Sequence, residues 1–271
     1  MSKRRTALLL ATAGALVLAV TALRTTASRG GSQHARASAL AALSTAAAAL
    51  PRPARPAFVV GTPFRLRKDE TRALFAPVAQ RAIARGAPAP TARPVAELVP
   101  TTPEGTTNIV LVLGELARPS GDWVHIRLPV LPNNRLAWVR RRALGGYQFV
   151  HTELVVDRER LTATLFKDGR AVFRARVGVG RSESPTPSGH FYIRDKLAGF
   201  GDPFYGPIAY GTSARSPVLT DWPGGGFVGI HGTNAPELIP GRISHGCIRL
   251  RNPDIVRLSH LMPVGTPLTI R

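Results

Sequence analysis

The sequence predicts a mainly β protein with one helix near the end of its larger domain. The first observation is alternation of apolar and polar side chains over residues 152–156, 161–166 and 171–179, which is typical of strands with one buried face. The second is Lys167-Asp168-Gly169, which has the composition of a tight hairpin turn. The third is Asn252-Pro253-Asp254, where an N-cap residue followed by proline marks the start of a helix.

The first 27 residues read as a targeting segment. Lys3-Arg4-Arg5 precedes an apolar run from Thr6 to Leu23, as in a secretory signal peptide or an uncleaved signal anchor. We therefore expect an extracytoplasmic protein of the cell envelope, either secreted or attached to the membrane through residues 1–27.

The next two segments carry weak structural signals. Residues 28–57 are rich in Ala, Pro and Arg and lack the large apolar side chains that a core requires, so they predict a tether. Residues 58–94 are a linker or part of an N-terminal module. Within them the pattern suggests a strand at 58–60 and a short helix over 69–75, ended by Pro77.

Residues 95–146 predict a small β module that resembles an SH3-like barrel. Three short apolar or alternating runs indicate strands, and a Pro-Asn-Asn turn separates the last two. Trp123 and Trp138 either pack on a strand face or form a ligand platform. Arg140-Arg141-Arg142 is either a solvated face or a polymer contact. The expected strands are 108–113, 123–128 and 136–140.

Residues 147–271 predict the main domain. After a strand at 191–193, a Gly- and Pro-rich stretch from 199 to 226 is expected to be an irregular lid or substrate wall, with Tyr205 contacting the substrate. Residues 227–231 predict a buried strand. The helix starting at Asn252 is expected to turn Ile255, Val256, Leu258 and Leu261 inward, and residues 267–270 are expected to close the sheet.

The charge is strongly basic and uneven. The formal net charge is +20, and from Tyr147 onward 15 basic residues face 10 acidic ones, which places net +15 in residues 1–146. A basic front half favours a polyanionic neighbourhood. The charge alone fits nucleic acid, anionic lipid or an acidic wall polymer. The targeting segment narrows this choice, and we expect anionic cell-wall polymers as partners, no nucleic acid, and the membrane through residues 1–27 if these are uncleaved.

Cys247 is the strongest candidate for chemistry. It is the only cysteine in the chain, so an exported form cannot make an internal disulfide, and a thiol retained there is explained by catalysis. A thiol acts as a nucleophile when a nearby imidazole accepts its proton, and we assign His231 as that base. Backbone N–H groups of Gly246 and Cys247, with His245 as a further candidate, would form an oxyanion hole.

These residues also carry a family resemblance. Residues 229–233, Gly-Ile-His-Gly-Thr, and residues 244–251, Ser-His-Gly-Cys-Ile-Arg-Leu-Arg, resemble the active-site signature of the YkuD-type L,D-transpeptidases of bacterial peptidoglycan. Residues 186–191, Thr-Pro-Ser-Gly-His-Phe, and residues 205–207, Tyr-Gly-Pro, extend the similarity. Many members have Asn two residues after the cysteine, whereas this chain has Arg249 and follows the Cys-Ile-Arg variant.

The resemblance implies a β-sandwich catalytic domain with a C-terminal helix, preceded by the small SH3-like module. It also implies that the Gly232 carbonyl steadies the base. Arg249 either binds a substrate carboxylate or forms a structural ion pair, and His245 lines the acceptor path or has a structural role. The expected substrate-binding residues are Tyr205, Ser244, His245 and Arg249.

The implied reaction is acyl transfer between peptidoglycan stem peptides through a thioester on Cys247. It forms cross-links in cell-wall biogenesis without a cofactor or metal, and carbapenem β-lactams are expected to be covalent inhibitors. Three alternatives remain open. They are a carboxypeptidase that uses water as acceptor, a non-catalytic wall-binding module, and a zinc hydrolase built on His231, His245 and Cys247, for which the sequence offers no further ligand at obvious spacing.

Overall fold

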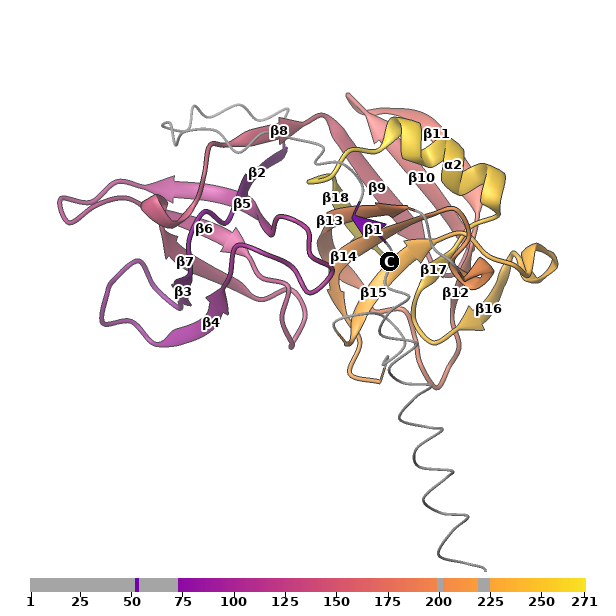
Figure 1. Cartoon of the computed structure of the whole chain (residues 1–271), viewed down its shortest axis with the longest axis horizontal. Coiled ribbons are helices and arrows are strands. Elements are labelled where there is room, and N and C mark those ends of the chain that lie inside the picture. Colours follow the sequence, from indigo (N-terminus) through magenta and orange to yellow (C-terminus); the bar gives the residue numbers. More distant parts are fainter. Residues whose placement is uncertain (1–51, 54–72, 199–201, 219–224) are drawn as a thin grey trace, which may run out of the picture. The chain divides into compact units, whose positions relative to one another are not determined.

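The computed structural model describes residues 52–53, 73–198, 202–218 and 225–271. The described residues belong to one compact unit that contains two β-sheets (Figure 1). The predicted targeting segment, nearly all of the tether and the predicted strand at 58–60 lie outside the described residues. Within the described part of the chain, no helix is long and apolar enough to cross a lipid bilayer.

The smaller sheet is antiparallel and has the strand order β4-β3-β7-β6-β5-β2-β8. Its own apolar core includes Val110, Val124, Ile126 and Val139, all fully buried. The strands are β2 (Ala73–Pro77), β3 (Ala82–Arg85), β4 (Pro94–Leu98), β5 (Ile109–Leu116), β6 (Trp123–Arg127), β7 (Leu136–Arg140) and β8 (Gln148–Val150), with a 3-10 turn η1 (Arg141–Ala143) between the last two.

The helix expected over 69–75 is wrong where the structure describes it. Residues 73–75 begin β2, which pairs with β5 on one side and β8 on the other. Leu74, for example, lies opposite both Val112 and Phe149. Partners distant in sequence supply these backbone hydrogen bonds, and such tertiary pairing overrides a weak local helical signal.

The larger sheet runs in the order β11-β10-β9-β18-β13-β14-β15-β17-β12-β16, and β1 (Arg52–Pro53) pairs with β13. Among the described residues, the mainly β fold with one helix is confirmed. Its strands are β9 (Thr152–Asp157), β10 (Thr162–Lys167), β11 (Arg170–Arg176), β12 (Gly178–Gly180), β13 (Gly189–Ala198), β14 (Ile208–Arg215), β15 (Phe227–His231), β16 (Gly241–Ser244), β17 (Ile248–Arg249) and β18 (Pro267–Ile270).

The local turn prediction is confirmed and the loop prediction is corrected. Asp168 and Gly169 both have positive φ and connect β10 to β11, as a two-residue hairpin requires. The stretch from 199 to 226 is not irregular throughout, because β14 crosses it between β13 and β15. Small residues and glycine hide this strand from pattern analysis, since neighbours on both sides stabilise it.

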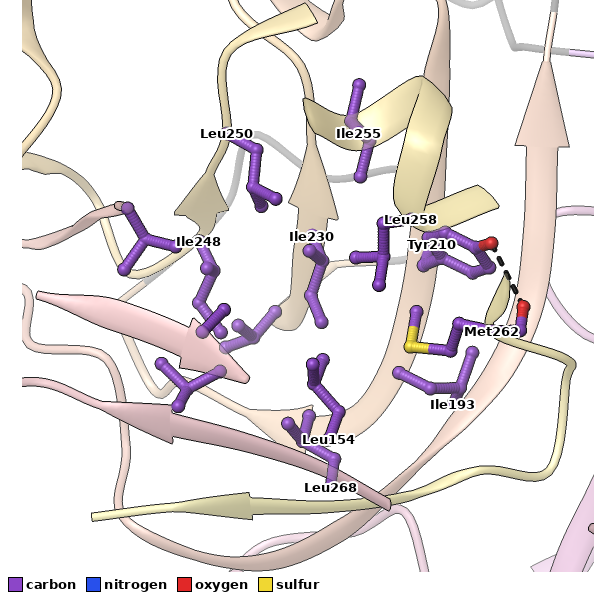
Figure 2. Packing of buried hydrophobic residues seen from close by; sticks show 14 of the residues in the cluster. Leu154, Ile193, Tyr210, Ile230, Ile248, Leu250, Ile255, Leu258, Met262 and Leu268 are labelled. Carbon is purple, nitrogen blue, oxygen red and sulfur yellow. Dashed lines mark hydrogen bonds between the residues drawn. The ribbon is translucent and has the colours of Figure 1, made fainter. Parts of the chain in front are cut away.

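One helix, α2 (Asn252–Leu261), packs on the core of the larger sheet (Figure 2). Ile255 and Leu258 are fully buried as predicted, whereas Val256 and Leu261 are each 37% exposed, so their predicted inward orientation is wrong. The Tyr210 hydroxyl donates to the Met262 carbonyl just beyond the helix at 3.1 Å. This bond joins the end of α2 to β14.

The two sheets share a buried joint. An apolar cluster combines Phe75 and Ile109 of the smaller sheet with Tyr192 of β13 and with Val264, which follows α2. The Tyr192 hydroxyl donates to the Ile109 carbonyl at 3.0 Å. Within the joint, the Arg194 guanidinium contacts Glu104 at 2.6 Å and Asp195 at 3.2 Å, and all three side chains are 1% exposed.

Candidate active site

The candidate nucleophile and base come from neighbouring parallel strands. β15 ends at His231 and pairs with β17, where His231 lies opposite Arg249. Cys247 directly precedes β17, and its Sγ accepts a hydrogen bond from the Gly229 N–H at 3.3 Å. Gly229 is two residues before His231 on β15. The topology thus brings the only thiol of the chain to the strand that carries the base.

His231 is held in the tautomer that a base requires. Its Nδ1 contacts the Gly232 carbonyl at 2.7 Å, and a carbonyl oxygen accepts only, so the ring proton is on Nδ1. The residue is fully buried, and Nε2 has no hydrogen-bond partner among the described residues. Within the described residues, the lone pair on Nε2 is therefore available to accept a proton from a reacting group.

The environment of His231 favours the neutral ring. Burial, and secondly the positive charge of Arg249, lower its pKa from 6.5 to about 3, although the Gly232 carbonyl acts in the opposite direction. Burial penalises the imidazolium because it removes the water that would solvate the charge. At neutral pH the ring is consequently uncharged and able to accept a proton.

An aromatic pair covers the base. The 3-10 turn η2 (Pro203–Tyr205) places the Tyr205 ring edge-on to the His231 ring with centroids 5.1 Å apart, and the Phe204 ring lies 5.9 Å away. The Arg249 guanidinium lies over Phe204 at 4.3 Å. Tyr205 was singled out from the sequence, and its contact with substrate stays a prediction. From the sequence, Phe204 is expected only to pack within its own loop, because nothing in the sequence pairs it with Arg249.

Two hydroxyl groups fix the loop that carries Cys247. The Ser244 hydroxyl donates to the Cys247 carbonyl at 2.5 Å and accepts from the Gly246 N–H at 3.1 Å. The Thr186 hydroxyl donates to the Gly246 carbonyl at 2.8 Å and accepts from the Gly180 N–H at 2.8 Å. Thr186 and Ser244 are 1% exposed, so both hydroxyls act in a dry interior where an unmade hydrogen bond is costly.

This loop bears on the predicted oxyanion hole. Gly246 has φ of +125°, a conformation that side chains rarely adopt, which explains the glycine. Its N–H is engaged with Ser244, so an oxyanion contact from Gly246 would require that bond to be shared or exchanged. The roles of Gly246, Cys247 and His245 in stabilising an oxyanion remain predictions. His245 is exposed, in contrast to His231.

Asn252 links three segments of the site. Its Oδ1 accepts from the Thr233 N–H at 2.8 Å, so this side chain holds the loop after the base, and Arg251 occupies the helix N-cap that was expected for Asn252. A Cβ on Gly206 or Gly232 would lie within 2.4 Å of the same oxygen. Both glycines are therefore required by close packing around Asn252.

No metal-binding cluster accompanies these residues. In residues 73–198, 202–218 and 225–271, no three His, Cys, Asp or Glu side chains are grouped as a metal ion requires. The zinc-hydrolase alternative therefore has no ligand set within the described structure.

Residues 151–270 match the family model of the YkuD L,D-transpeptidase catalytic domain. The putative L,D-transpeptidase YkuD of Bacillus subtilis is 36% identical over 109 residues, which cover 40% of this chain and 59% of that protein. The probable L,D-transpeptidase YbiS of Escherichia coli is 57% identical over 42 residues, covering 16% of this chain and 14% of that protein.

Solved structures of L,D-transpeptidases also align with parts of this chain. A mutant of Enterococcus faecium L,D-transpeptidase is 27% identical, with 44% of this chain and 49% of that chain covered and a TM-score of 0.35. An L,D-transpeptidase of Mycobacterium tuberculosis in complex with a faropenem-derived adduct is 17% identical, with 60% and 91% covered and a TM-score of 0.36. The resemblance expected from the sequence motifs is confirmed for residues 151–270.

Proposed function

Because residues 151–270 carry the catalytic domain of the YkuD-type L,D-transpeptidases, we propose that this chain is a cysteine-dependent acyltransferase that cross-links peptidoglycan stem peptides. The observation that carries the proposal is the state of His231. It is a fully buried, neutral imidazole whose Nδ1 is held by a carbonyl and whose Nε2 has no partner among the described residues. That arrangement beside the only thiol of the chain suits a general base for a nucleophile.

In the first half-reaction, Cys247 Sγ attacks the carbonyl carbon of the third stem-peptide residue while the thiol proton passes to His231 Nε2. A tetrahedral intermediate forms, and backbone N–H groups of the 244–247 loop would stabilise its oxyanion. The bond to the terminal D-amino acid then breaks. The imidazolium returns its proton to the departing amine, which leaves a thioester on Cys247.

In the second half-reaction, an amine of another stem peptide attacks the thioester carbonyl. His231 takes a proton from that amine, and the sulfur leaves and is protonated again. One amide has replaced another, so the exchange needs no external energy source and no cofactor. A reaction that needs no external energy source fits the proposed location of the enzyme outside the cytoplasm.

Arg249 and Tyr205 are proposed to receive the donor peptide. Arg249 is 8% exposed and lies over Phe204, so its guanidinium is oriented beside the base. A planar guanidinium in such a site can hold a carboxylate through two hydrogen bonds. The charge also keeps His231 neutral, which gives Arg249 an influence on the base in addition to any contact with substrate.

The decisive experiment is product analysis with a purified stem tetrapeptide, alone and together with a second stem that carries a free amine. A cross-linked product that the Cys247→Ser variant does not form supports the proposal. Tripeptide without cross-links would instead establish the carboxypeptidase, and unchanged substrate without any acyl-enzyme would establish a non-catalytic module.

A further inference from the structure

A basic pocket lies in the smaller sheet, apart from the residues of the candidate active site. Its volume is about 320 Å³, and four arginines from β3, β7 and the segments next to them line it together with Trp123. The arginines are Arg81, Arg85, Arg140 and Arg142.

Strand pairing explains how these side chains meet. Arg85 lies opposite Trp138 across the β3–β7 pair, and Trp123 lies opposite Arg140 across the β6–β7 pair. Residues directly opposite in antiparallel strands share one face of the sheet, and Trp138 and Arg140 are two residues apart on β7. These side chains therefore emerge on the same face of the smaller sheet.

Backbone contacts hold two of the guanidinium groups in place. Arg85 Nη1 donates to the Ala92 carbonyl at 2.7 Å, and Arg140 Nη1 donates to the Ser120 carbonyl at 2.8 Å. The Arg140 guanidinium also lies over the Trp123 ring at 4.3 Å. A guanidinium has five N–H donors, so each group retains donors for a ligand after these contacts.

Most of the positive charge in the pocket is uncompensated. Arg81 pairs with Glu97 at 2.6 Å. Within the described part of the chain, Arg85, Arg140 and Arg142 have no carboxylate at ion-pair distance. Like charges gathered around one concave surface attract an anion more strongly than the same charges dispersed.

Trp123 adds a donor without an acceptor. The side chain is 1% exposed, and its Nε1–H has no hydrogen-bond partner among the described residues. Buried N–H groups of this kind are rare in folded proteins, and an exception calls for an explanation. Trp123 lines the pocket, but this N–H is itself buried, so the arginines carry the binding proposed below.

We propose that this arginine pocket binds the phosphate groups of a linear polyanion and so retains the enzyme at an anionic polymer. Planar guanidinium groups suit phosphate oxygens. Three uncompensated arginines exceed what a single monoanion needs, which favours a chain of charges over a small ion. Ile83, which is 40% exposed on the rim, offers an apolar contact for the carbon segments between phosphates. This binding is separate from acyl transfer.

The test titrates the full-length chain with short-chain inorganic polyphosphate at several salt concentrations. The double variant Arg85→Gln/Arg142→Gln is compared with Arg174→Gln/Arg176→Gln, which removes the same charge from exposed positions on β11. The pocket variant should bind about tenfold more weakly or worse, and its logarithmic salt dependence should fall by about two. The β11 variant should stay within about twofold of the native chain.

Four results would overturn the proposal. The first is an equal loss of polyphosphate affinity in both double variants. The second and third are orthophosphate, or polyglutamate of matched charge, binding as tightly as polyphosphate. The fourth is single-stranded oligothymidylate binding more tightly than polyphosphate through the same arginines. The last would make the partner a nucleic acid. Labelling of Cys247 by a carbapenem should be unchanged in every variant, so failure of this proposal is distinguishable from failure of the proposed acyl transfer.

Discussion

The two sheets differ in where their polar side chains lie. The larger sheet places the imidazole of His231, the hydroxyls of Thr186 and Ser244 and the guanidinium of Arg249 in its interior, next to the ends of β15 and β17. The smaller sheet fills its main core with apolar side chains and keeps most of its arginines partly or fully exposed.

The difference indicates which region performs chemistry and which makes contacts. Burying a polar group costs free energy unless it is hydrogen-bonded, so a concentration of such groups is unfavourable for stability alone. In the larger sheet, the hydroxyls of Thr186 and Ser244 hold the Cys247 loop, and the Gly232 carbonyl holds the ring of His231. In the smaller sheet, the exposed arginines cost little folding free energy because water still solvates them, and they can bind a partner.

The largest effect is expected for the base. His231→Ala should reduce turnover of a stem tetrapeptide by about 10²–10⁴-fold, because general-base catalysis contributes that much. His245→Ala should reduce it less, because this histidine is exposed. Steady-state kinetics on the two variants measures both effects. Equal or reversed losses would show that the base has been misassigned.

The next effect concerns the joint between the sheets. Glu104→Gln should lower the free energy of unfolding by about 3–5 kcal/mol, since it leaves the buried Arg194 without its closest carboxylate. Glu97→Gln breaks the exposed pair with Arg81 and should cost at most about 1 kcal/mol. Urea unfolding of both variants gives the comparison. Similar costs would mean that the buried ion pair does not stabilise the joint.

A smaller loss is expected from the loop that carries the nucleophile. Thr186→Val keeps the shape of the side chain but leaves the Gly246 carbonyl and the Gly180 N–H without their partner, which should cost about 1–3 kcal/mol. Turnover should fall as well, because the Cys247 loop loses a hydrogen bond that holds it in position. Thr164→Val on β10 is the control. If Thr186→Val loses stability and keeps full turnover, the hydroxyl is structural only.

The last effect is a pH dependence of stability, which is small for each pH unit and accumulates between pH 6.5 and about 3. The pKa of His231 is about 3 in the folded chain and 6.5 in the reference state, so between these values the unfolded chain binds one more proton. Stability is therefore fully present above about pH 6.5 and falls as the pH decreases toward 3, by at most about 1.4 kcal/mol per pH unit. His231→Gln should remove this contribution from the slope measured by urea unfolding. An unchanged slope would contradict the buried, neutral ring.

Sequence reasoning was most successful where a local pattern determines the structure. The Asp168-Gly169 hairpin and the buried strand ending at His231 follow from short-range preferences, and both are confirmed. The motif around Cys247 predicted the resemblance to the L,D-transpeptidase catalytic domain whose family model matches residues 151–270.

The incorrect or missing predictions concern places where contacts between distant segments determine the structure. β14 has small residues and is stabilised from both sides, and β2 owes its strand to partners in β5 and β8. The contacts of Thr186 with Gly246 and of Asn252 with Thr233 join segments that no spacing rule connects. The sequence therefore indicated the nucleophile and the base, while the groups that position them required the fold.

The central claim is that Cys247 is a nucleophile served by His231, and covalent labelling tests it most directly. The full-length chain, Cys247→Ser and His231→Ala are each incubated with a carbapenem, and the intact mass of the protein is measured. Because the chain has one cysteine, a thiol adduct reports this site alone. The native chain should gain one adduct, Cys247→Ser none, and His231→Ala the same adduct more slowly. A native chain that gains no adduct, or a Cys247→Ser variant that gains one, would contradict the account.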